Sequence, residues 1–343
     1  MAKTFCISIW SFFNSDCKKI KISQTMNKLK LLSIIVPTYN QEMGINEFYA
    51  RIKAVLKSIE HEFDYEIVFV NDFSRDNTKS ILRNLAKFDT KITVINFSRN
   101  FGNQIGIAAG IDHCRGDIAV IIDDDLQDPP EVILEFIKKW NLGYKVVYGI
   151  RKKRPGVSIA FRALANLYYR ILNKLADIEI PNDTGDFRLI DKVIIDSLRK
   201  IKEENRYYRG LVTWLGYPQI GVVYERDERY AGKSNFSFGK YFNFAINGIT
   251  AFTDKPLRIL SFIGLFITSI AFFLIFAMVL IKLFYPQITI QGWTSLMILV
   301  TFFGGVQLLS IGILGIYVGK IYTETKGRPL YLIESIDSSI NSN

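Results

Sequence analysis

The chain has 343 residues, of which 49% are hydrophobic and 14% aromatic, so it can bury a sizeable core and is not wholly disordered. Its length suits one large domain or two ordinary ones. Lys and Arg exceed Asp and Glu by ten, and residues 136–176 alone hold ten basic residues and no acidic one. This dense positive stretch predicts an anionic partner: nucleic acid, a membrane surface or a phosphorylated substrate.

Cysteine and histidine are scarce in this sequence. The three cysteines are scattered, which argues against a disulfide framework and a Cys-rich zinc site and suits a reducing compartment. With only two histidines, His61 and His113, a His-based triad or a multi-His metal centre is nearly impossible. Any metal must therefore be held by oxygen ligands, which favours Mg²⁺ or Mn²⁺.

Residues 1–30 are expected to be a dispensable N-terminal extension. Residues 4–13 are apolar but too short to span a membrane, and the lysines that follow lie on the wrong side for a signal peptide. Met26 directly precedes the first globular pattern, which favours an upstream start codon. A peripheral membrane contact is the alternative.

Strand and helix patterns alternate over the next part of the chain and predict an α/β fold with a mostly parallel sheet. The first helix carries its apolar face from residue 48 to 59, with Asn46 as the expected N-cap. There is no GxxxxGK loop and no GxGxxG, so the P-loop and dinucleotide patterns are absent. Expected strands are residues 31–36, 65–70, 92–97, 118–122 and 146–149, and further helices are residues 77–88, 101–114 and 129–140.

Acidic residues follow two of these strands, at the edge where open α/β sheets bind ligands. Asp72 follows the second strand, and Asp123, Asp124 and Asp125 follow the fourth. Three consecutive acids after an apolar strand are costly unless a cation compensates them. Asp123 and Asp125 can both reach a divalent ion across a tight turn, with Gln127 as a further oxygen ligand. A solvated acidic turn is the alternative.

Two long uncharged runs, residues 259–281 and 292–319, are each long enough to span a membrane. The outer flanks carry basic residues and the link at 282–291 carries one charge. The positive-inside rule then places both flanks, the globular part and both termini in the cytoplasm. We therefore expect a plasma (inner) membrane protein with two spans and a cytoplasmic tail at 320–343.

The segment just before the first span interleaves aromatic and polar residues. Residues 236–258 therefore predict an amphipathic helix in the membrane interface, with a buried soluble helix as the alternative. Glycines at 304, 305, 312, 315 and 319 permit close helix approach, either within the hairpin, which is favoured, or in a homo-oligomer.

Several stretches, in order, resemble glycosyltransferase family 2. They are residues 33–40 (SIIVPTYN), 70–74 (VNDFS), 123–131 (DDDLQDPPE), 184–189 (TGDFRL) and 231–234 (AGKS), and the resemblance covers about residues 31–325. It implies a GT-A fold, with residues 31–235 as the catalytic domain. Within the family the chain looks most like the polyprenyl-phosphate branch of dolichyl-phosphate mannose synthases and bactoprenol glucosyltransferases. Two departures are Phe73, where Gly is common, and Asp124, where a small residue is usual.

The resemblance also implies roles for individual residues. Pro37, Tyr39 and Asp72 lie where the family contacts the donor nucleoside, and Asp124 is counted with them. Asp123, Asp125 and Gln127 would hold Mg²⁺ or Mn²⁺ against the donor diphosphate, which makes Asp125 catalytic. Asp186 matches a catalytic base, although an already ionised lipid phosphate hardly needs one. Arg188, counted as catalytic, and Lys233 would contact the acceptor phosphate, with solvated-face roles as the alternative for both. Lys233 and Ser234 are counted among the ligand-binding residues.

The expected activity is inverting transfer of a monosaccharide from a nucleotide sugar to polyprenyl (undecaprenyl) phosphate, feeding cell-envelope glycan or lipid glycosylation. UDP-glucose is favoured, while GDP-mannose and UDP-GlcNAc stay open. A processive polysaccharide synthase is disfavoured because the chain has only two candidate spans and no QxxRW motif. A membrane-anchored binding protein without activity is disfavoured by the retained acids. A nucleic-acid partner is not expected, because it would leave the spans and the acid cluster unexplained.

Overall fold

The computed structural model describes residues 29–152, 184–204, 206–227, scattered positions between 257 and 284, and 292–338. Most of the N-terminal extension, Lys233, Ser234 and the expected interfacial segment up to residue 256 lie outside the described residues, as does the basic stretch beyond Lys152. The expected first span is described only at scattered positions, all of them helical.

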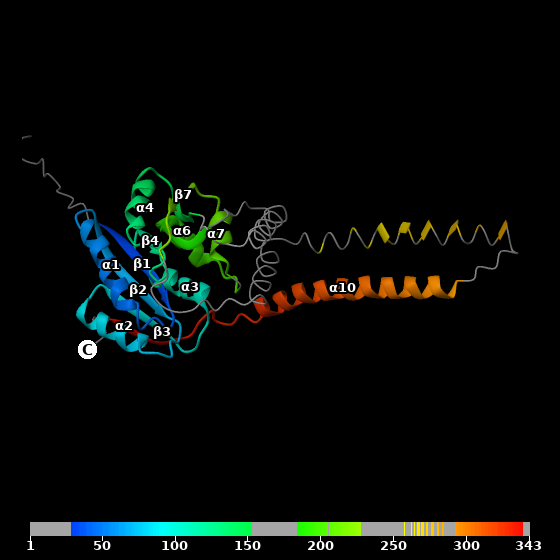
Figure 1. The fold of residues 1–343 in the computed structure, drawn as a ribbon, viewed down its shortest axis with the longest axis horizontal. Coiled ribbons are helices and arrows are strands. Elements are labelled where there is room, and N and C mark those ends of the chain that lie inside the picture. The colour runs from blue at the N-terminus through cyan, green and yellow to red at the C-terminus, as the bar shows by residue number, and fades with distance from the viewer. Residues whose placement is uncertain are drawn as a thin grey trace, which may run out of the picture.

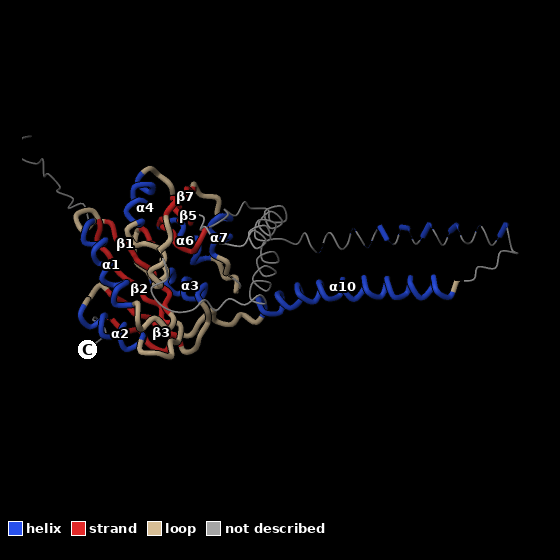
Figure 2. Tube along the Cα trace, in the orientation of Figure 1, coloured by secondary structure: helices blue, strands red, loops and turns tan. Residues whose placement is uncertain are grey.

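One sheet of eight strands organises the domain, in the order β7-β5-β6-β4-β1-β2-β3-β8 (Figures 1 and 2). Six strands run parallel, while β6 and β8 run antiparallel to their neighbours. The predicted α/β class with a mostly parallel sheet is therefore confirmed. The strands are β1 Lys30–Thr38, β2 Phe63–Asn71, β3 Ile92–Phe97, β4 Ile118–Ile121, β5 Val146–Arg151, β6 Thr184–Asp191, β7 Gln219–Tyr224 and β8 Ile333–Ser338.

Helices cover both faces of the sheet, because alternate strand residues point to opposite faces and both sets are apolar. In β1, Leu32, Ile34 and Val36 pack in one core with α1, α2 and α4, whereas Ile35 packs in a second core with α3, α6 and α7. The helices of the domain are α1 Ile45–Ser58, α2 Thr78–Phe88, α3 Asn103–His113, α4 Val132–Asn141, α6 Lys192–Lys200 and α7 Tyr208–Trp214.

The start of α1 differs from the prediction. The helix begins at Ile45 with Gly44 as N-cap, so Asn46 lies inside its first turn and is not the cap. The backbone N–H groups of Gly44 and Ile45 both donate to the carbonyl oxygen of Gln41. This turn already directs the chain into the helix before Asn46, so no capping side chain is needed there.

The last helix, α10 (Trp293–Thr325), leaves the domain as a long rod (Figure 1). Among the described residues, one helix is long and apolar enough to cross a membrane, over Phe302–Thr325. The helix continues past residue 319, where the tail was expected to begin. The chain then returns, and β8 pairs with the edge of β3, so part of the expected tail belongs to the sheet.

Candidate active site

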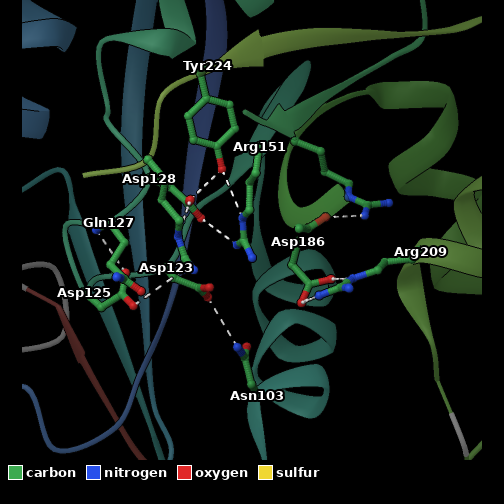
Figure 3. A network of polar contacts seen from close by, with 12 residues as sticks. Asn103, Asp123, Asp125, Gln127, Asp128, Arg151, Asp186, Arg209 and Tyr224 are labelled. Carbon is green, nitrogen blue, oxygen red and sulfur yellow. Dashed lines mark hydrogen bonds and ion pairs between the residues drawn. The ribbon is translucent and has the colours of Figure 1, made fainter. Parts of the chain in front are cut away.

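The loops that follow β1, β2, β3 and β4 lie at one edge of the sheet, because these four strands are parallel. The start of β6 reaches the same edge, because β6 runs antiparallel to β4 and pairs Arg188 with Ile121. Asp186 therefore lies beyond the end of β4, near the loop that carries Asp123 and Asp125. The topology thus brings the two predicted acidic motifs together (Figure 3).

The acid loop after β4 is a tight and partly strained turn. The backbone N–H of Gln127 donates to Asp125 Oδ1 at 3.1 Å, and Leu126 between them has φ of 58°, a left-handed conformation that is uncommon outside glycine. Asp123 Oδ1 accepts a hydrogen bond from Asn103 Nδ2 of α3 at 3.3 Å. Burial and the nearby charges of Asp186, Asp128 and Asp125 raise the pKa of Asp123 to about 7.

Asp128 anchors this loop to the neighbouring strands. Its side chain is fully buried and accepts hydrogen bonds from Tyr224 Oη at 2.5 Å and from Arg151 Nη2 at 3.2 Å. Arg226 Nε lies 3.3 Å from Asp128 Oδ1, and Arg226 Nη2 lies 3.9 Å from Asp125 Oδ2. The loop is thus fixed from β5, β7 and the residues just after β7.

Asp124, the middle residue of the acid cluster, is also buried. Its Oδ2 atom has no hydrogen-bond partner, and burial raises its pKa well above the usual range.

Within the described residues no three His, Cys, Asp or Glu side chains are grouped closely enough to hold a metal ion. The oxygen ligands Asp123, Asp125 and Gln127 nevertheless suit Mg²⁺, which proteins bind through one or two carboxylates plus substrate phosphates and water. The metal set stays a prediction.

Asp186 is held from two helices. Arg209 of α7 donates from Nε to Oδ1 at 3.0 Å and from Nη2 to Oδ2 at 3.3 Å, and Gln104 of α3 donates to Oδ2 at 3.0 Å (Figure 3). Burial alone would raise the pKa of Asp186, but the charges of Arg209 and Arg188 and these hydrogen bonds outweigh it and lower the pKa. Asp186 is therefore an ionised, oriented carboxylate.

Arg188 lies next to this pair but is almost fully buried. Its guanidinium donates to the carbonyl oxygens of Gly185 at 3.0 Å and Tyr208 at 3.5 Å, while its Nε atom has no hydrogen-bond partner. Burial lowers the pKa of Arg188 to about 10. It is thus Arg209 that forms the ion pair with Asp186, and the phosphate role of Arg188 stays a prediction.

At the other end of the edge, Asp72 supports the loop before α3. Its two carboxylate oxygens accept hydrogen bonds from the backbone N–H groups of Phe101, at 2.6 Å, and Gly102, at 2.8 Å. Tyr39 and Phe73 are 43% and 41% exposed beside it, whereas Pro37 is buried. Phe73 has φ of 60°, a conformation that glycine adopts without strain, so the usual Gly at this position has a backbone reason.

Comparison with known proteins decides the family. A profile of glycosyl transferase family 2 matches residues 33–199. The uncharacterized glycosyltransferase YkcC of Bacillus subtilis is 45% identical over 302 residues, 88% of this chain and 93% of that protein. The chain belongs to glycosyltransferase family 2. A bactoprenol glucosyl transferase of Shigella phage SfX is 39% identical over 89% of this chain and 99% of its own. A prophage bactoprenol glucosyl transferase homolog of Escherichia coli K12 is 38% identical over the same shares.

This glycosyltransferase carries site residues that sequence reasoning did not single out. They approach the predicted acids only in the fold, since Gln104 and Asp186 are 82 residues apart in sequence, and Asp128 and Tyr224 are 96 apart. Asp128 stood within the quoted acidic motif, so that motif was the available signal for it. The residues that were missed are Asn103, Gln104, Asp128, Arg209, Tyr224 and Arg226.

Proposed function

We propose that this glycosyltransferase moves a glucosyl group from UDP-glucose to polyprenyl phosphate at the cytoplasmic face of the plasma membrane. The observation that carries this proposal is the similarity to two proteins named for bactoprenol glucosyl transfer, which extends over 99% of each of them. A match of that extent includes the C-terminal apolar part as well as the nucleotide-sugar domain. GDP-mannose and UDP-GlcNAc are the competing donors.

The chemistry is a single displacement at the anomeric carbon. An oxygen of the lipid phosphate attacks this carbon, the bond to the donor diphosphate breaks, and UDP leaves with the electron pair. The acceptor phosphate, with a second pKa of about 6, is already a nucleophile at neutral pH. The low pKa of Asp186 and its bidentate contact with Arg209 support a role in orienting substrate rather than in removing a proton.

The acid loop is the proposed site of the divalent ion, either Mg²⁺ or Mn²⁺. Asp123, Asp125 and Gln127 supply oxygen ligands. Burial and the neighbouring negative charges raise the pKa of Asp123, and this crowding of carboxylates is consistent with a place that attracts a cation. When bound, the metal neutralises charge on the leaving diphosphate. Arg226 adds a positive charge beside Asp125 and Asp128 and keeps the loop in place.

The path of the chain supports a hairpin of two spans. The strand β8 comes after α10 and lies in the same sheet as the acid loop. If α10 crosses the membrane, the chain must therefore also cross between residues 227 and 292, so that both flanks stay on the side of the catalytic domain. Residues 259–281 are the apolar run available for that crossing, and the basic flanks favour the cytoplasmic side.

A donor panel tests the proposal. Purified full-length protein is incubated with Mg²⁺, polyprenyl phosphate and radiolabelled UDP-glucose, UDP-GlcNAc or GDP-mannose, and label in the organic phase is counted. We expect label from UDP-glucose to enter the lipid fraction. Transfer from GDP-mannose or UDP-GlcNAc, with none from UDP-glucose, would overturn UDP-glucose as the donor. Transfer only to a protein or a growing glycan would overturn the lipid phosphate as the acceptor.

A further inference from the structure

The segment that follows α10 reaches back to the loops at the proposed donor site. Ser98 donates its backbone N–H to the carbonyl oxygen of Leu332 at 3.0 Å, and Tyr331 stacks on Phe97 with ring centroids 5.2 Å apart. The strand β8 then pairs along β3. The membrane-helix candidate is therefore joined directly to the edge of the catalytic sheet.

A chain of buried side-chain hydrogen bonds runs from β8 into the sheet. Asn96 Nδ2 donates to Asp337 Oδ2 at 2.9 Å and to Ser335 Oγ at 3.1 Å, and Asn96 Oδ1 accepts from Asn71 Nδ2 at 2.8 Å. Asn71 Oδ1 in turn accepts the backbone N–H of Ser74 at 3.1 Å. Asn71 and Asn96 are both 1% exposed, so water cannot readily replace these partners.

The same chain extends to the loop after β1. Ser74 Oγ accepts the backbone N–H of Asn40 at 3.0 Å, and Asn40 Oδ1 accepts the backbone N–H of Arg75 at 2.8 Å. Asn40 and Phe73 have φ of 53° and 60°. The left-handed conformation costs about 1–2 kcal/mol at a residue such as Phe73 and less at an asparagine, so surrounding contacts must hold Phe73 in place. The two loops that carry Tyr39 and Asp72 thus depend on fixed hydrogen-bond partners.

We propose that Asp337, acting through Asn96 and Asn71, is a positioning residue for the donor nucleoside loops, so that the segment after the membrane helix completes the donor site. The inference rests on the proposed function, in which the donor is a nucleotide sugar, and on the predicted nucleoside contacts at Tyr39 and Asp72. The acceptor oxygen of Asp337 fixes the orientation of the Asn96 amide, whose own oxygen then accepts from Asn71, so the two amides are oriented in series.

The test uses full-length protein in detergent, with Mg²⁺ and UDP as the probe for binding calorimetry and UDP-glucose for kinetics. Asp337→Ala is expected to raise the UDP Kd and the donor KM about tenfold, which corresponds to about 1.4 kcal/mol. The kcat and the acceptor KM stay within about twofold, because Asp337 touches neither the acid loop nor Asp186. Asp337→Asn keeps an acceptor oxygen for Asn96 and is expected to restore the wild-type Kd.

Two matched variants separate this chain of hydrogen bonds from the ion pairs of β8. Arg83→Gln removes the partner that lies 3.5 Å from Asp337 Oδ1, and Lys79→Gln removes the pair with Glu334. Both are expected to leave the UDP Kd unchanged. If Asp337→Ala does not fold, Asp337→Ser replaces it, since its shorter side chain stays polar but does not reach Asn96.

The outcomes distinguish this inference from the proposed function. If Asp337→Ala binds UDP with the wild-type Kd, the role of Asp337 is overturned while the proposed function stands. An Arg83→Gln variant that reproduces the loss, or an Asp337→Asn variant that fails to restore binding, would overturn that role as well. Wild-type protein that binds neither UDP nor GDP in the presence of Mg²⁺ would overturn the proposed function and this role with it.

Discussion

Asp186 shows how the surroundings of one carboxylate limit its chemistry. It is buried beside the acid loop, yet its pKa is lowered, because Arg209 and Arg188 outweigh the effect of burial. A carboxylate held ionised by a bidentate arginine is a weak base and a fixed hydrogen-bond acceptor. It is therefore suited to orient a sugar hydroxyl or the acceptor.

Replacing Arg209 tests this electrostatic balance. In Arg209→Gln the main opposing charge is gone, so burial raises the pKa of Asp186 and the carboxylate is protonated at higher pH than in the wild type. The pH profile of kcat/KM is measured from about pH 5.5 to about pH 8.5. We expect its acidic limb to move to higher pH, so that the loss of activity is largest at the acidic end. Arg209→Lys keeps the charge and serves as the control. Parallel profiles for Arg209→Gln and the wild type would contradict the role of the pair.

Asp125 is the most sensitive position of the acid loop in this account. Asp125→Asn removes one negative charge from the proposed metal site while keeping the side-chain shape, so sugar transfer should fall by about a hundredfold or more. Glu135→Gln, at an exposed position of α4 where the side chain pairs with Lys138, is the control and should transfer normally. Unchanged turnover in Asp125→Asn would refute the metal assignment.

At the residue scale, the sequence predicts those site residues that belong to short local motifs. Asp123, Asp125 and Asp186 were predicted from motifs, and the fold brings them to one edge. Arg209, Gln104 and Arg226 were not, because a lone arginine or glutamine carries no local signal and their partners are far along the chain. For Lys233 and Ser234 the predictions stand as they were, since both lie outside the described residues.

Among the elements, α3 sets the distance between the acid loop and the donor loops, because it carries Asn103 and Gln104 and packs directly on β1. A Cβ atom at Gly110 would lie 2.1 Å from Ile35 Cγ2, so only glycine permits this approach. Gly110→Ala should therefore force α3 away from the sheet at a cost of about 1–3 kcal/mol.

The predicted result is a lower thermal midpoint for Gly110→Ala than for the wild type in detergent, by several degrees. Gly44→Ala, at the N-cap of α1 where a Cβ would come no closer than 3.6 Å to the neighbouring side chain of Gln41, is the control and should change the midpoint little. An unchanged midpoint in Gly110→Ala would show that the contact between α3 and β1 is looser than described.

Strands with continuous apolar runs were predictable, and those with mixed sequences were not. The four neighbouring strands β4, β1, β2 and β3, none of which lies at an edge of the sheet, are largely buried and read as apolar blocks. By contrast β8, with the sequence IESIDS, lies at an edge of the sheet and has apolar residues only at Ile333 and Ile336, without the alternation typical of a strand. It also follows a long apolar helix, so nothing local sets it apart from a tail. The antiparallel direction of β6 depends on a connection that sequence periodicity does not reveal.

For the whole molecule, the return of β8 to the catalytic sheet constrains the membrane topology. A reporter fused after Asn343 should be active in the cytoplasm, and one inserted in the link at 282–291 should be active outside. The physical reason is that β7, which precedes the proposed hairpin, and β8, which follows it, belong to one sheet. An external signal from the C-terminal fusion would contradict the two-span arrangement.

The proposed direct displacement of UDP from the sugar by a lipid phosphate is tested by the anomeric configuration of the lipid-linked product, measured by NMR together with the amount of UDP released. We expect one UDP per transferred glucose and a product whose configuration is inverted relative to UDP-glucose. Retained configuration, or UDP release without glucose on the lipid phosphate, would contradict it.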